Sequence, residues 1–272
     1  MIGHGRSYAT FRFYADLNDF LPPSRRQRPF PHPTYHGDQS VKHLIEAIGP
    51  PHTEVGLILV NGRAISFNYL VQAGDRISVY PPFATIDVSP LCQLRPSLPR
   101  PARFILDNHL GRLARTLRLL GFDALYLNDQ ADDAELAAIA AAEERILLTR
   151  DRGLLKRGNV AWGYCLRTRD SREQVTAVLH RFQLHDEIAP WRRCLRCNGL
   201  LQPVAKADVL HLLEPKTKLY FEEFRQCQSC GQVYWQGSHV ERLRPFVESV
   251  QNQPANQLKT AEIRAKDKQD SS

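Results

Sequence analysis

Apolar positions in the middle of the chain alternate between the spacing of strands and the spacing of helices. Short apolar runs, which are typical of buried strands, occupy residues 104–106, 124–128, 146–149 and 160–166. Leucines recur on one helical face between residues 109 and 120, and a second amphipathic helix is expected to begin at Asp132 and Asp133. This order predicts a parallel α/β sheet within residues 102–186.

The first part of the chain has a different pattern, which predicts a small α+β domain over residues 7–84. Residues 41–48 read as a short helix with Ser40 in the N-cap position. Asn61–Gly62 is a hairpin signal, and the proline- and arginine-rich residues 21–33 are interpreted as a loop. The strands of this domain are predicted at residues 10–14, 54–60 and 76–80.

Three further segments complete the chain. Four prolines within residues 85–101 predict a stiff linker. Residues 190–245 carry two pairs of cysteines and are interpreted as a separate domain. Residues 246–272 are polar and poor in apolar side chains, so we expect a disordered tail.

The charge of the chain bears on its partner. The 272 residues carry a net charge of +7, and the pI is about 9.2. This balance favours an acidic partner such as nucleic acid. The N-terminal residues lack the apolar run of a signal peptide, and no stretch has the roughly 18 apolar residues of a membrane helix. We therefore expect a cytoplasmic protein without a membrane partner.

Aspartates stand where the predicted sheet would bring side chains together. Asp107 and Asp151 follow apolar strands, and Asp133 lies at a helix start. Residues past the ends of parallel strands converge on one crevice, so these carboxylates are candidate ligands for Mg²⁺ or Mn²⁺. Structural roles compete with this interpretation, because acids favour helix N-termini and turns. The helix-start role is assigned here to Asp132.

Other charged residues near these acids also allow two interpretations. Asp170 follows the last predicted strand and is a fourth candidate ligand, although Ser171 with Gln174 fits a helix cap equally well. Arg150 precedes Asp151 and is a candidate RNA contact. The helix predicted at residues 109–120 carries three arginines on its polar face, Arg112, Arg115 and Arg118. These arginines form either a solvated surface or a track that binds phosphates.

The cysteines predict a metal site of a different kind. Cys194 and Cys197 form one CxxC pair, and Cys227 and Cys230 form another roughly thirty residues later, a spacing found in zinc ribbons. Four thiolates leave no open position, so a structural Zn²⁺ is predicted rather than a catalytic one. A redox role is the weaker alternative. The remaining cysteines are interpreted as small buried hydrophobic residues, Cys92 and Cys165.

Aromatic and basic residues surround these cysteines. Tyr234 and Trp235 either stack on bases or pack over the zinc knuckle, and packing is the preferred interpretation. His239 is a candidate phosphate contact, although a lone histidine is more often structural. Positive charge near the first knuckle adds plausible RNA contacts at Arg192, Arg193 and Arg196.

Two quoted segments carry a resemblance to a known family. Residues 104–123, FILDNHLGRLARTLRLLGFD, together with residues 145–151, RILLTRD, resemble the Mut-seven C-terminal RNase family, which belongs to the PIN-like nucleases. The resemblance implies a compact, PIN-like fold with a Rossmann-like parallel sheet. It also implies a metal-dependent RNase site in which Asp107, Asp133 and Asp151 match the acids of the family. The fourth acid of PIN nucleases has no clear counterpart, and Asp170 is the nearest substitute.

The N-terminal domain carries a second resemblance. Residues 55–63 and 73–82 resemble the ubiquitin-like β-grasp domain that precedes this nuclease in some members. Similar small proteins carry sulfur on a terminal Gly-Gly, which is missing after Pro81–Pro82 here. The remaining interpretation is an interaction module for RNA or a protein partner.

These observations lead to one expected function and one alternative. The expected function is hydrolysis of RNA, chiefly as an endonuclease, by carboxylates that hold Mg²⁺ or Mn²⁺ and a water activated by the metal. The alternative is an RNA-binding or adaptor protein whose acidic site is degenerate. The preference for endonuclease action comes from the resemblance to PIN-like nucleases, because the residues themselves do not choose between endonuclease and exonuclease action.

Overall fold

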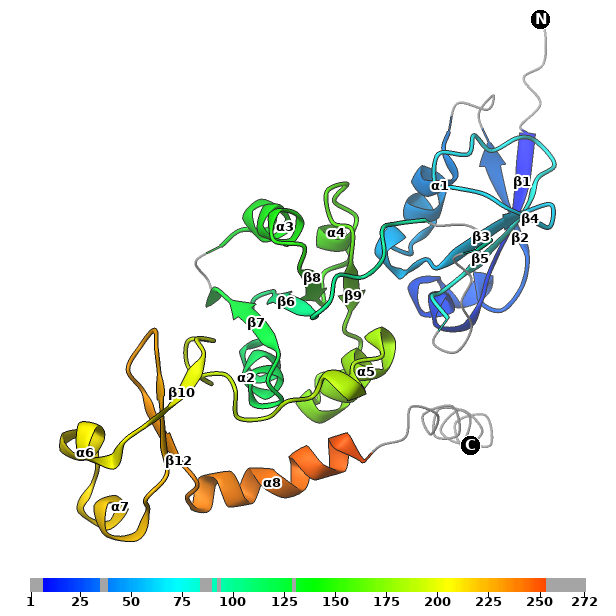
Figure 1. The fold of residues 1–272 in the computed structure, drawn as a ribbon. Coiled ribbons are helices and arrows are strands. Elements are labelled where there is room, and N and C mark those ends of the chain that lie inside the picture. Colours follow the sequence, from blue (N-terminus) through cyan, green and yellow to red (C-terminus); the bar gives the residue numbers. More distant parts are fainter. Residues whose placement is uncertain (1–6, 35–38, 84–89, 92–93, 129–130, 253–272) are drawn as a thin grey trace, which may run out of the picture. The chain divides into compact units, whose positions relative to one another are not determined.

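The computed structural model describes residues 7–34, 39–83, 90–91, 94–128 and 131–252 (Figure 1). The chain divides into two compact units. The first comprises Met1–Asn108 and Leu127–Arg167, and the second comprises His109–Tyr126 and Thr168–Ser272. Within the described residues, no helix combines the length and the apolarity that a bilayer crossing requires.

The N-terminal part of the first unit is a five-stranded mixed sheet with one helix. Its strand order is β2-β1-β5-β3-β4, and β1 runs parallel to β5 in the middle of the sheet. Helix α1 (Val41–Ile48) begins at the predicted cap, where Ser40 Oγ accepts a hydrogen bond from His43 N–H at 3.3 Å. This is the predicted β-grasp fold. The strands are β1 (Ser7–Phe13), β2 (Phe30–Thr34), β3 (Leu57–Val60), β4 (Arg63–Ala64) and β5 (Arg76–Tyr80).

Two local predictions for this domain have opposite outcomes. Asn61 and Gly62 have φ angles of 51° and 83° and join β3 to β4, so the hairpin turn is confirmed. The predicted loop over residues 21–33 is wrong at its end, because β2 begins at Phe30 and pairs with β1. Strand β2 lies at the edge of the sheet, where a proline removes no ladder hydrogen bond that a neighbour needs. The earlier part of the stretch contains the short 3₁₀ helix η2 (Pro23–Arg25), which follows η1 (Ala15–Phe20).

The second part of the first unit is a parallel sheet, as predicted. Strand β8 (Ile146–Thr149) pairs in parallel with β6 (Arg103–Leu106) on one side and with β9 (Gly163–Cys165) on the other. Strand β8 is buried along its whole length. Helix α3 (Asp133–Ala142) precedes β8, and the short α4 (Arg152–Leu155) follows it. The described strand β9 is shorter than the run of residues 160–166 predicted for it.

The β-grasp part contacts the parallel sheet within this unit. The 3₁₀ helix η3 (His52–Glu54) occupies the beginning of the predicted strand 54–60 and lies against β9. Glu54 is fully buried, and its Oε1 accepts a hydrogen bond from Cys165 N–H at 2.6 Å. His52 Nε2 lies 2.9 Å from the Val160 carbonyl oxygen. Arg167, beyond β9, is 3.0 Å from Asp16 Oδ2. The β-grasp part therefore covers an edge strand of the parallel sheet.

The second unit contains three elements of the α/β part and the cysteine-bearing domain. Its α/β elements are α2 (Gly111–Leu119), β7 (Asp123–Tyr126) and α5 (Ser171–Phe182), and α2 packs against α5. A 3₁₀ turn, η5 (His185–Glu187), follows α5.

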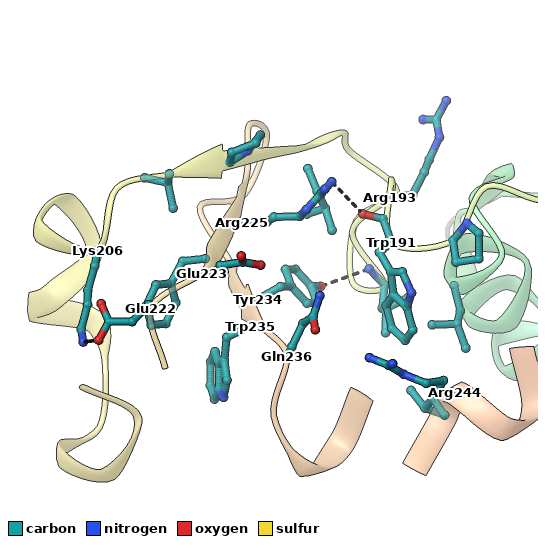
Figure 2. Close-up of a pocket in the computed structure, with 18 of the residues that line it drawn as sticks. Trp191, Arg193, Lys206, Glu222, Glu223, Arg225, Tyr234, Trp235, Gln236 and Arg244 are labelled. Atoms are coloured by element: carbon teal, nitrogen blue, oxygen red, sulfur yellow. Dashed lines mark hydrogen bonds and ion pairs between the residues drawn. The ribbon is translucent and has the colours of Figure 1, made fainter. Parts of the chain in front are cut away.

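The cysteine-bearing domain is a small antiparallel sheet with an insertion. Its strands lie in the order β10-β11-β12. Helix α8 (Ser238–Gln251) follows the sheet, so the prediction of disorder from residue 246 is wrong as far as Gln251, and residues 253–272 lie outside the described residues. The ribbon and α8 line a cavity of about 550 Å³ (Figure 2). The other elements are β10 (Leu201–Val204), α6 (Lys206–Val209), η6 (Leu210–Leu212), α7 (Pro215–Tyr220), β11 (Phe224–Cys227) and β12 (Val233–Trp235).

The buried Glu54 generates a stability prediction. Glu54→Ala leaves the Cys165 N–H without its acceptor and removes a carboxylate 3.9 Å from Arg167, so the free energy of unfolding should fall by about 3 kcal/mol. Asp19→Ala is the matched control, because Asp19 is 3.6 Å from the same arginine but 46% exposed. It should cost less than about 1 kcal/mol. Urea unfolding measures both, and equal losses would contradict the buried contact.

Candidate functional site

Asp107 and Thr149 meet at the ends of neighbouring parallel strands. The register that pairs Leu106 with Leu148 brings Asp107 beside Thr149, the last residue of β8. The Thr149 hydroxyl donates a hydrogen bond to Asp107 Oδ2 at 2.5 Å, and Asp107 N–H donates to the Leu148 carbonyl oxygen at 3.0 Å. Thr149 is fully buried, whereas Asp107 is partly exposed. The strand ends therefore orient the Asp107 carboxylate at an accessible edge of the sheet.

The two aspartates at the start of α3 have different roles. Asp132 is the N-cap, and its Oδ1 accepts a hydrogen bond from Glu135 N–H at 2.8 Å, so its structural interpretation is confirmed. Burial raises the pKa of the Asp133 carboxyl above its ordinary value, and the negative charges of Asp151 and Asp107 raise this pKa further. Repulsion of this kind acts between nearby carboxylates. The three predicted ligands thus lie close enough to interact within the first unit.

Asp151 combines a strand-end position with a helix cap. Its Oδ1 accepts a hydrogen bond from Gly153 N–H at 2.6 Å, and α4 begins at the next residue. Its own N–H donates to Thr149 Oγ1 at 2.8 Å. One buried hydroxyl thereby links the Asp151 backbone to the Asp107 carboxylate. Capping uses one oxygen of Asp151, and an ionised carboxylate keeps further lone pairs for a cation.

The spacing of these acids distinguishes them from the cysteines. In the described part of the chain, the four ribbon cysteines are the group whose ligand atoms all lie within 4.8 Å of one another. The three described aspartates do not form a group of this kind. Mg²⁺ usually keeps several waters between itself and its protein ligands, so it does not require such a group. The donor set therefore fits a hard divalent cation such as Mg²⁺ or Mn²⁺ in kind.

Asp170 belongs to the second unit and acts as a helix cap. Its Oδ1 accepts hydrogen bonds from Arg172 N–H at 2.9 Å and from Glu173 N–H at 3.0 Å. The predicted cap over Ser171 and Gln174 is therefore shifted by one residue, with Asp170 as the N-cap of α5. These backbone hydrogen bonds lower the pKa of the exposed Asp170 carboxyl. Capping explains this aspartate without a metal, and its role as a ligand stays a prediction.

The predicted arginine stripe contains two exposed residues rather than three. Arg112 and Arg115 on α2 are exposed, whereas Arg118 on the same helix is only 5% exposed, so the prediction of a three-residue phosphate track is wrong at Arg118. Arg150 is exposed between β8 and α4. His239 lies in α8, and its side chain is outside the described residues.

Arg118 has a structural role that sequence patterning did not indicate. Its Nε donates a hydrogen bond to the Ala124 carbonyl oxygen of β7 at 2.9 Å. One of its terminal nitrogens lies 3.2 Å from the Leu195 carbonyl oxygen and 3.0 Å from that of Arg196, both inside the first CxxC loop. The arginine therefore ties α2, β7 and a cysteine loop together. Helical spacing could not show this, because the partners lie far away in the sequence.

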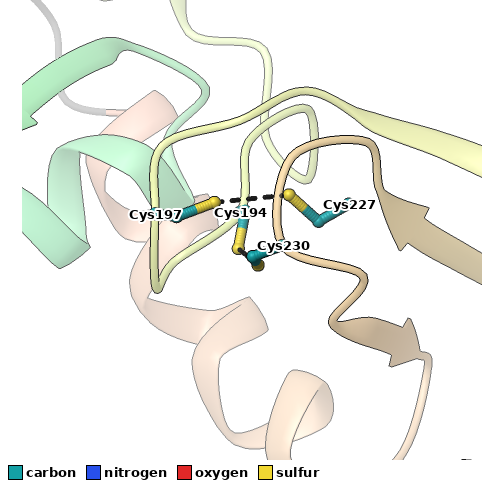
Figure 3. Close-up of side chains that lie close together, drawn as sticks. All are labelled: Cys194, Cys197, Cys227 and Cys230. Carbon is teal, nitrogen blue, oxygen red and sulfur yellow. Dashed lines mark hydrogen bonds between the residues drawn. The ribbon is translucent and has the colours of Figure 1, made fainter.

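The four cysteines form a compact cluster (Figure 3). Cys194 Sγ is 3.7 Å from Cys230 Sγ, and Cys197 Sγ is 3.4 Å from Cys227 Sγ. Tetrahedral zinc with bonds of about 2.3 Å requires sulfur atoms about 3.8 Å apart, so the cluster fits a structural Zn²⁺.

The two cysteine loops repeat one geometry, which supports a shared metal. Asn198 and Gly231 follow the second cysteine of each pair, with φ angles of 71° and 72°. Their N–H groups donate to the carbonyl oxygens of Cys194 and Cys227, each at 3.0 Å. Both loops therefore turn through a residue in the left-handed region. Asn198 also anchors its loop to β7, because its Oδ1 accepts from Ala124 N–H at 3.0 Å.

The aromatic residues after the second loop serve the ribbon. The Tyr234 hydroxyl accepts a hydrogen bond from Leu195 N–H at 3.1 Å and lies 3.1 Å from Cys194 Sγ. Trp235 packs against the ribbon core and tilts against Phe224, with ring centroids 6.5 Å apart. The preferred packing interpretation is therefore confirmed for both aromatic residues.

Of the two cysteines outside the pairs, the structure describes Cys165. Cys165 is buried in β9, as predicted, and burial raises the pKa of its thiol to about 11. A thiol of this kind is a poor nucleophile at neutral pH. Cys92 lies outside the described residues.

Two family models match this chain, one after the other along the sequence. The Mut7-C RNAse domain family model matches residues 102–247, more than half of the chain, and the Mut7-C ubiquitin model matches residues 6–87. The class of protein is thus a nuclease with a ubiquitin-like domain in front of it. The chain belongs to the Mut7-C RNase domain family.

A curated relative agrees with this assignment over a limited region. The human protein described as "Exonuclease mut-7 homolog" is 39% identical over 111 residues, which cover 38% of this chain and 12% of the human protein. The chain therefore corresponds to a small part of that relative. No solved structure matches the chain.

The ribbon geometry predicts the metal content. Purified protein should contain a single zinc ion per chain, and Cys227→Ser should lose the zinc and lower the melting temperature, because a structural zinc site contributes directly to folding. Metal analysis with a thermal melt measures both. Cys165→Ala is the control and should retain the zinc, since Cys165 lies in a different unit. Retention of zinc by Cys227→Ser would contradict the four-cysteine site.

Carboxylate repulsion predicts how stability responds to divalent cations. In zinc-loaded protein without Mg²⁺ or Mn²⁺, Asp133→Asn should raise the free energy of unfolding by about 0.5 kcal/mol, because it removes a charge that burial and the neighbouring aspartates disfavour. The direction follows from the raised pKa of Asp133, because the ionised form of this carboxyl destabilises the folded state at neutral pH. Added Mn²⁺ should raise the melting temperature of the wild type more than that of the variant. Equal shifts would argue against a shared cation.

Proposed function

We propose that this chain is a metal-dependent ribonuclease whose centre is formed by Asp107, Asp133 and Asp151. The observation that carries the proposal is the gathering of three carboxylates beside the ends of parallel strands β6 and β8, where burial and the negative charges of Asp151 and Asp107 raise the pKa of Asp133. Such a concentration of negative charge is costly unless a cation balances it. Membership of a nuclease family supplies a reaction for that cation.

The residues of the chain have separate duties in this proposal. Asp107 is oriented by the Thr149 hydroxyl, and Asp151 is held by its capping bond to Gly153, so both carboxylates are placed before any ligand arrives. Asp133 carries the carboxylate that gains most from a nearby cation. The chemistry that Mg²⁺ or Mn²⁺ supplies when bound is activation of a water and neutralisation of charge on the phosphate.

RNA as the substrate class rests on several observations. The matching family model is described as an RNAse domain, and the chain carries a net charge of +7. Exposed arginines that can contact phosphates are present at Arg150 in the first unit and at Arg112 and Arg115 in the second. In the proposed mechanism a water molecule attacks phosphorus, and the ribose hydroxyl takes no part. Single-stranded DNA, which lacks that hydroxyl, is therefore the comparison substrate.

We propose endonucleolytic cleavage as the mode of action. Asp151 is exposed, and Asp107 and Asp133 are partly exposed, so the acidic edge is open enough to accept an internal phosphodiester. The name of the human relative contains the word exonuclease, but the match covers 12% of that protein. A circular single-stranded RNA separates the modes, because an exonuclease requires a chain end. Cleavage of the circle supports the proposal, and cleavage of linear RNA alone would contradict it.

Neighbouring aspartates provide a sharp test of the catalytic assignment. Asp107→Asn and Asp133→Asn should each lower the rate of Mn²⁺-dependent RNA cleavage by at least about a hundredfold, because each removes a charge that holds the cation. Asp132→Asn is the matched control. It removes the same charge one residue away and keeps an N-cap side chain, so its rate should stay within about twofold of the wild type.

The outcomes separate the nuclease from an adaptor with a degenerate site. Cleavage that requires metal and is lost in both ligand variants supports the nuclease. Wild-type protein that binds RNA and cleaves none with either Mg²⁺ or Mn²⁺ would establish the adaptor alternative. Loss of cleavage in Asp132→Asn to the same degree would show that total charge matters rather than the proposed site.

A further inference from the structure

The second unit contains a cavity remote in sequence from the three aspartates. It has a volume of about 550 Å³ and is lined by the ribbon sheet, the residues before the first cysteine and helix α8. In Figure 2, Trp191 and Arg244 lie at one end of the labelled set, Lys206 and Glu222 lie at the other, and Tyr234, Trp235 and Gln236 lie between them. The size suits a single nucleotide rather than a folded partner.

Aromatic rings in this cavity are held in place by the surrounding structure. Trp191 has a φ of 64°, and its N–H donates to the Leu119 carbonyl oxygen at 3.3 Å. Its ring is partly exposed, whereas the Tyr234 hydroxyl is fixed at the zinc site. A non-glycine residue in the left-handed region persists only where its surroundings impose that conformation. The backbone of Trp191 is therefore held in place, and its ring lines the cavity.

The cavity lining has more positive than negative charges that are not used in ion pairs. Arg193 pairs with Asp123 at 3.3 Å, and Lys206 pairs with Glu222 at 2.5 Å. Two further arginines, Arg225 and Arg244, form no ion pair with any residue that the structure describes. Glu223 is the remaining acid of the lining, so the excess charge is positive.

Arg225 is also positioned relative to the aromatic face. One of its terminal nitrogens lies 3.5 Å from the Trp191 carbonyl oxygen, a long contact that leaves the other guanidinium donors available. Gln236 lines the same space and offers both a donor and an acceptor, as Figure 2 shows. An aromatic face, unpaired guanidinium groups and an amide are what a base with an attached phosphate requires.

We propose that this cavity is a nucleotide subsite that binds one unpaired nucleotide of a single-stranded RNA. The base stacks on Trp191, and Arg225 and Arg244 bind its phosphates. The choice of RNA rests on the proposed function, whereas the stacking and phosphate contacts rest on the cavity itself. The subsite binds a nucleotide of the RNA that does not carry the phosphodiester being cleaved. It therefore contributes to the affinity for RNA and not to the chemical step.

The test measures binding apart from cleavage. Full-length Asp107→Asn protein, loaded with zinc, is titrated into fluorescein-labelled oligouridine, and fluorescence anisotropy reports binding. In this background, Arg225→Gln with Arg244→Gln should weaken binding on the order of tenfold and reduce its salt dependence. Trp191→Leu should weaken binding to a similar degree. An oligomer of abasic sites and a double-stranded RNA should both compete poorly.

A matched control separates local contacts from net charge. Lys216→Gln with Lys218→Gln removes two positive charges from α7, outside the cavity lining, and should leave binding within about twofold. Zinc content and melting temperature of every variant should equal those of the parent, which shows that the ribbon is intact. Loss of zinc in Trp191→Leu leaves the arginine pair as the deciding variant.

Each result bears on the proposal. Weakening in the cavity variants and not in the lysine control supports the subsite. Equal weakening in both sets, or none in the arginine pair, overturns it. Abasic RNA that binds as well as oligouridine overturns the stacking role. Wild-type protein that fails to cleave RNA refutes the proposed function and leaves this result standing, whereas cleavage by the cavity variants at the wild-type rate with unchanged affinity refutes the subsite alone.

Discussion

Repulsion between carboxylates at one edge of a small parallel sheet is the constraint on which the first unit depends. Burial and the negative charges of Asp151 and Asp107 raise the pKa of the Asp133 carboxyl, so its ionised form is disfavoured beside them. The cost is tolerated because Thr149 orients Asp107 and a backbone amide holds Asp151. Strand β8 carries that threonine and is buried along its whole length, so a buried element positions Asp107.

The domains around this sheet support it in different ways. Within the first unit, Glu54 of the β-grasp part accepts a hydrogen bond from edge strand β9, which makes that part a structural partner of the nuclease sheet. An interaction with RNA or a protein partner through this domain stays a prediction. Within the second unit, buried Arg118 joins α2 and β7 to the first cysteine loop. The zinc ribbon is thereby anchored to α/β elements rather than tethered by a flexible segment.

Local signals in the sequence predicted much of this architecture. Ser40 caps α1, Asn61–Gly62 turns a hairpin and Asp132 caps α3, because each effect depends on residues within a few positions. The cysteine pairs were equally legible, since their spacing alone defines a tetrahedral site. The fold class followed from the order of apolar runs and from the family resemblance.

Features that depend on distant partners could not be predicted in this way. Arg118 lies on the polar face of its helix by spacing, yet it is buried because carbonyl groups about eighty residues away surround it. Strand β2 was not predicted because it contains prolines, which are tolerated in a strand at the edge of a sheet. The cavity beside Trp191 is formed by segments that meet only in the folded ribbon.

The most direct measurement of the central claim is anomalous diffraction from a crystal grown with Mn²⁺. The account predicts a manganese peak bounded by Asp107, Asp133 and Asp151, with waters completing its coordination. A crystal whose anomalous map has no peak among these three aspartates, at a concentration of Mn²⁺ that supports cleavage in solution, would contradict the account.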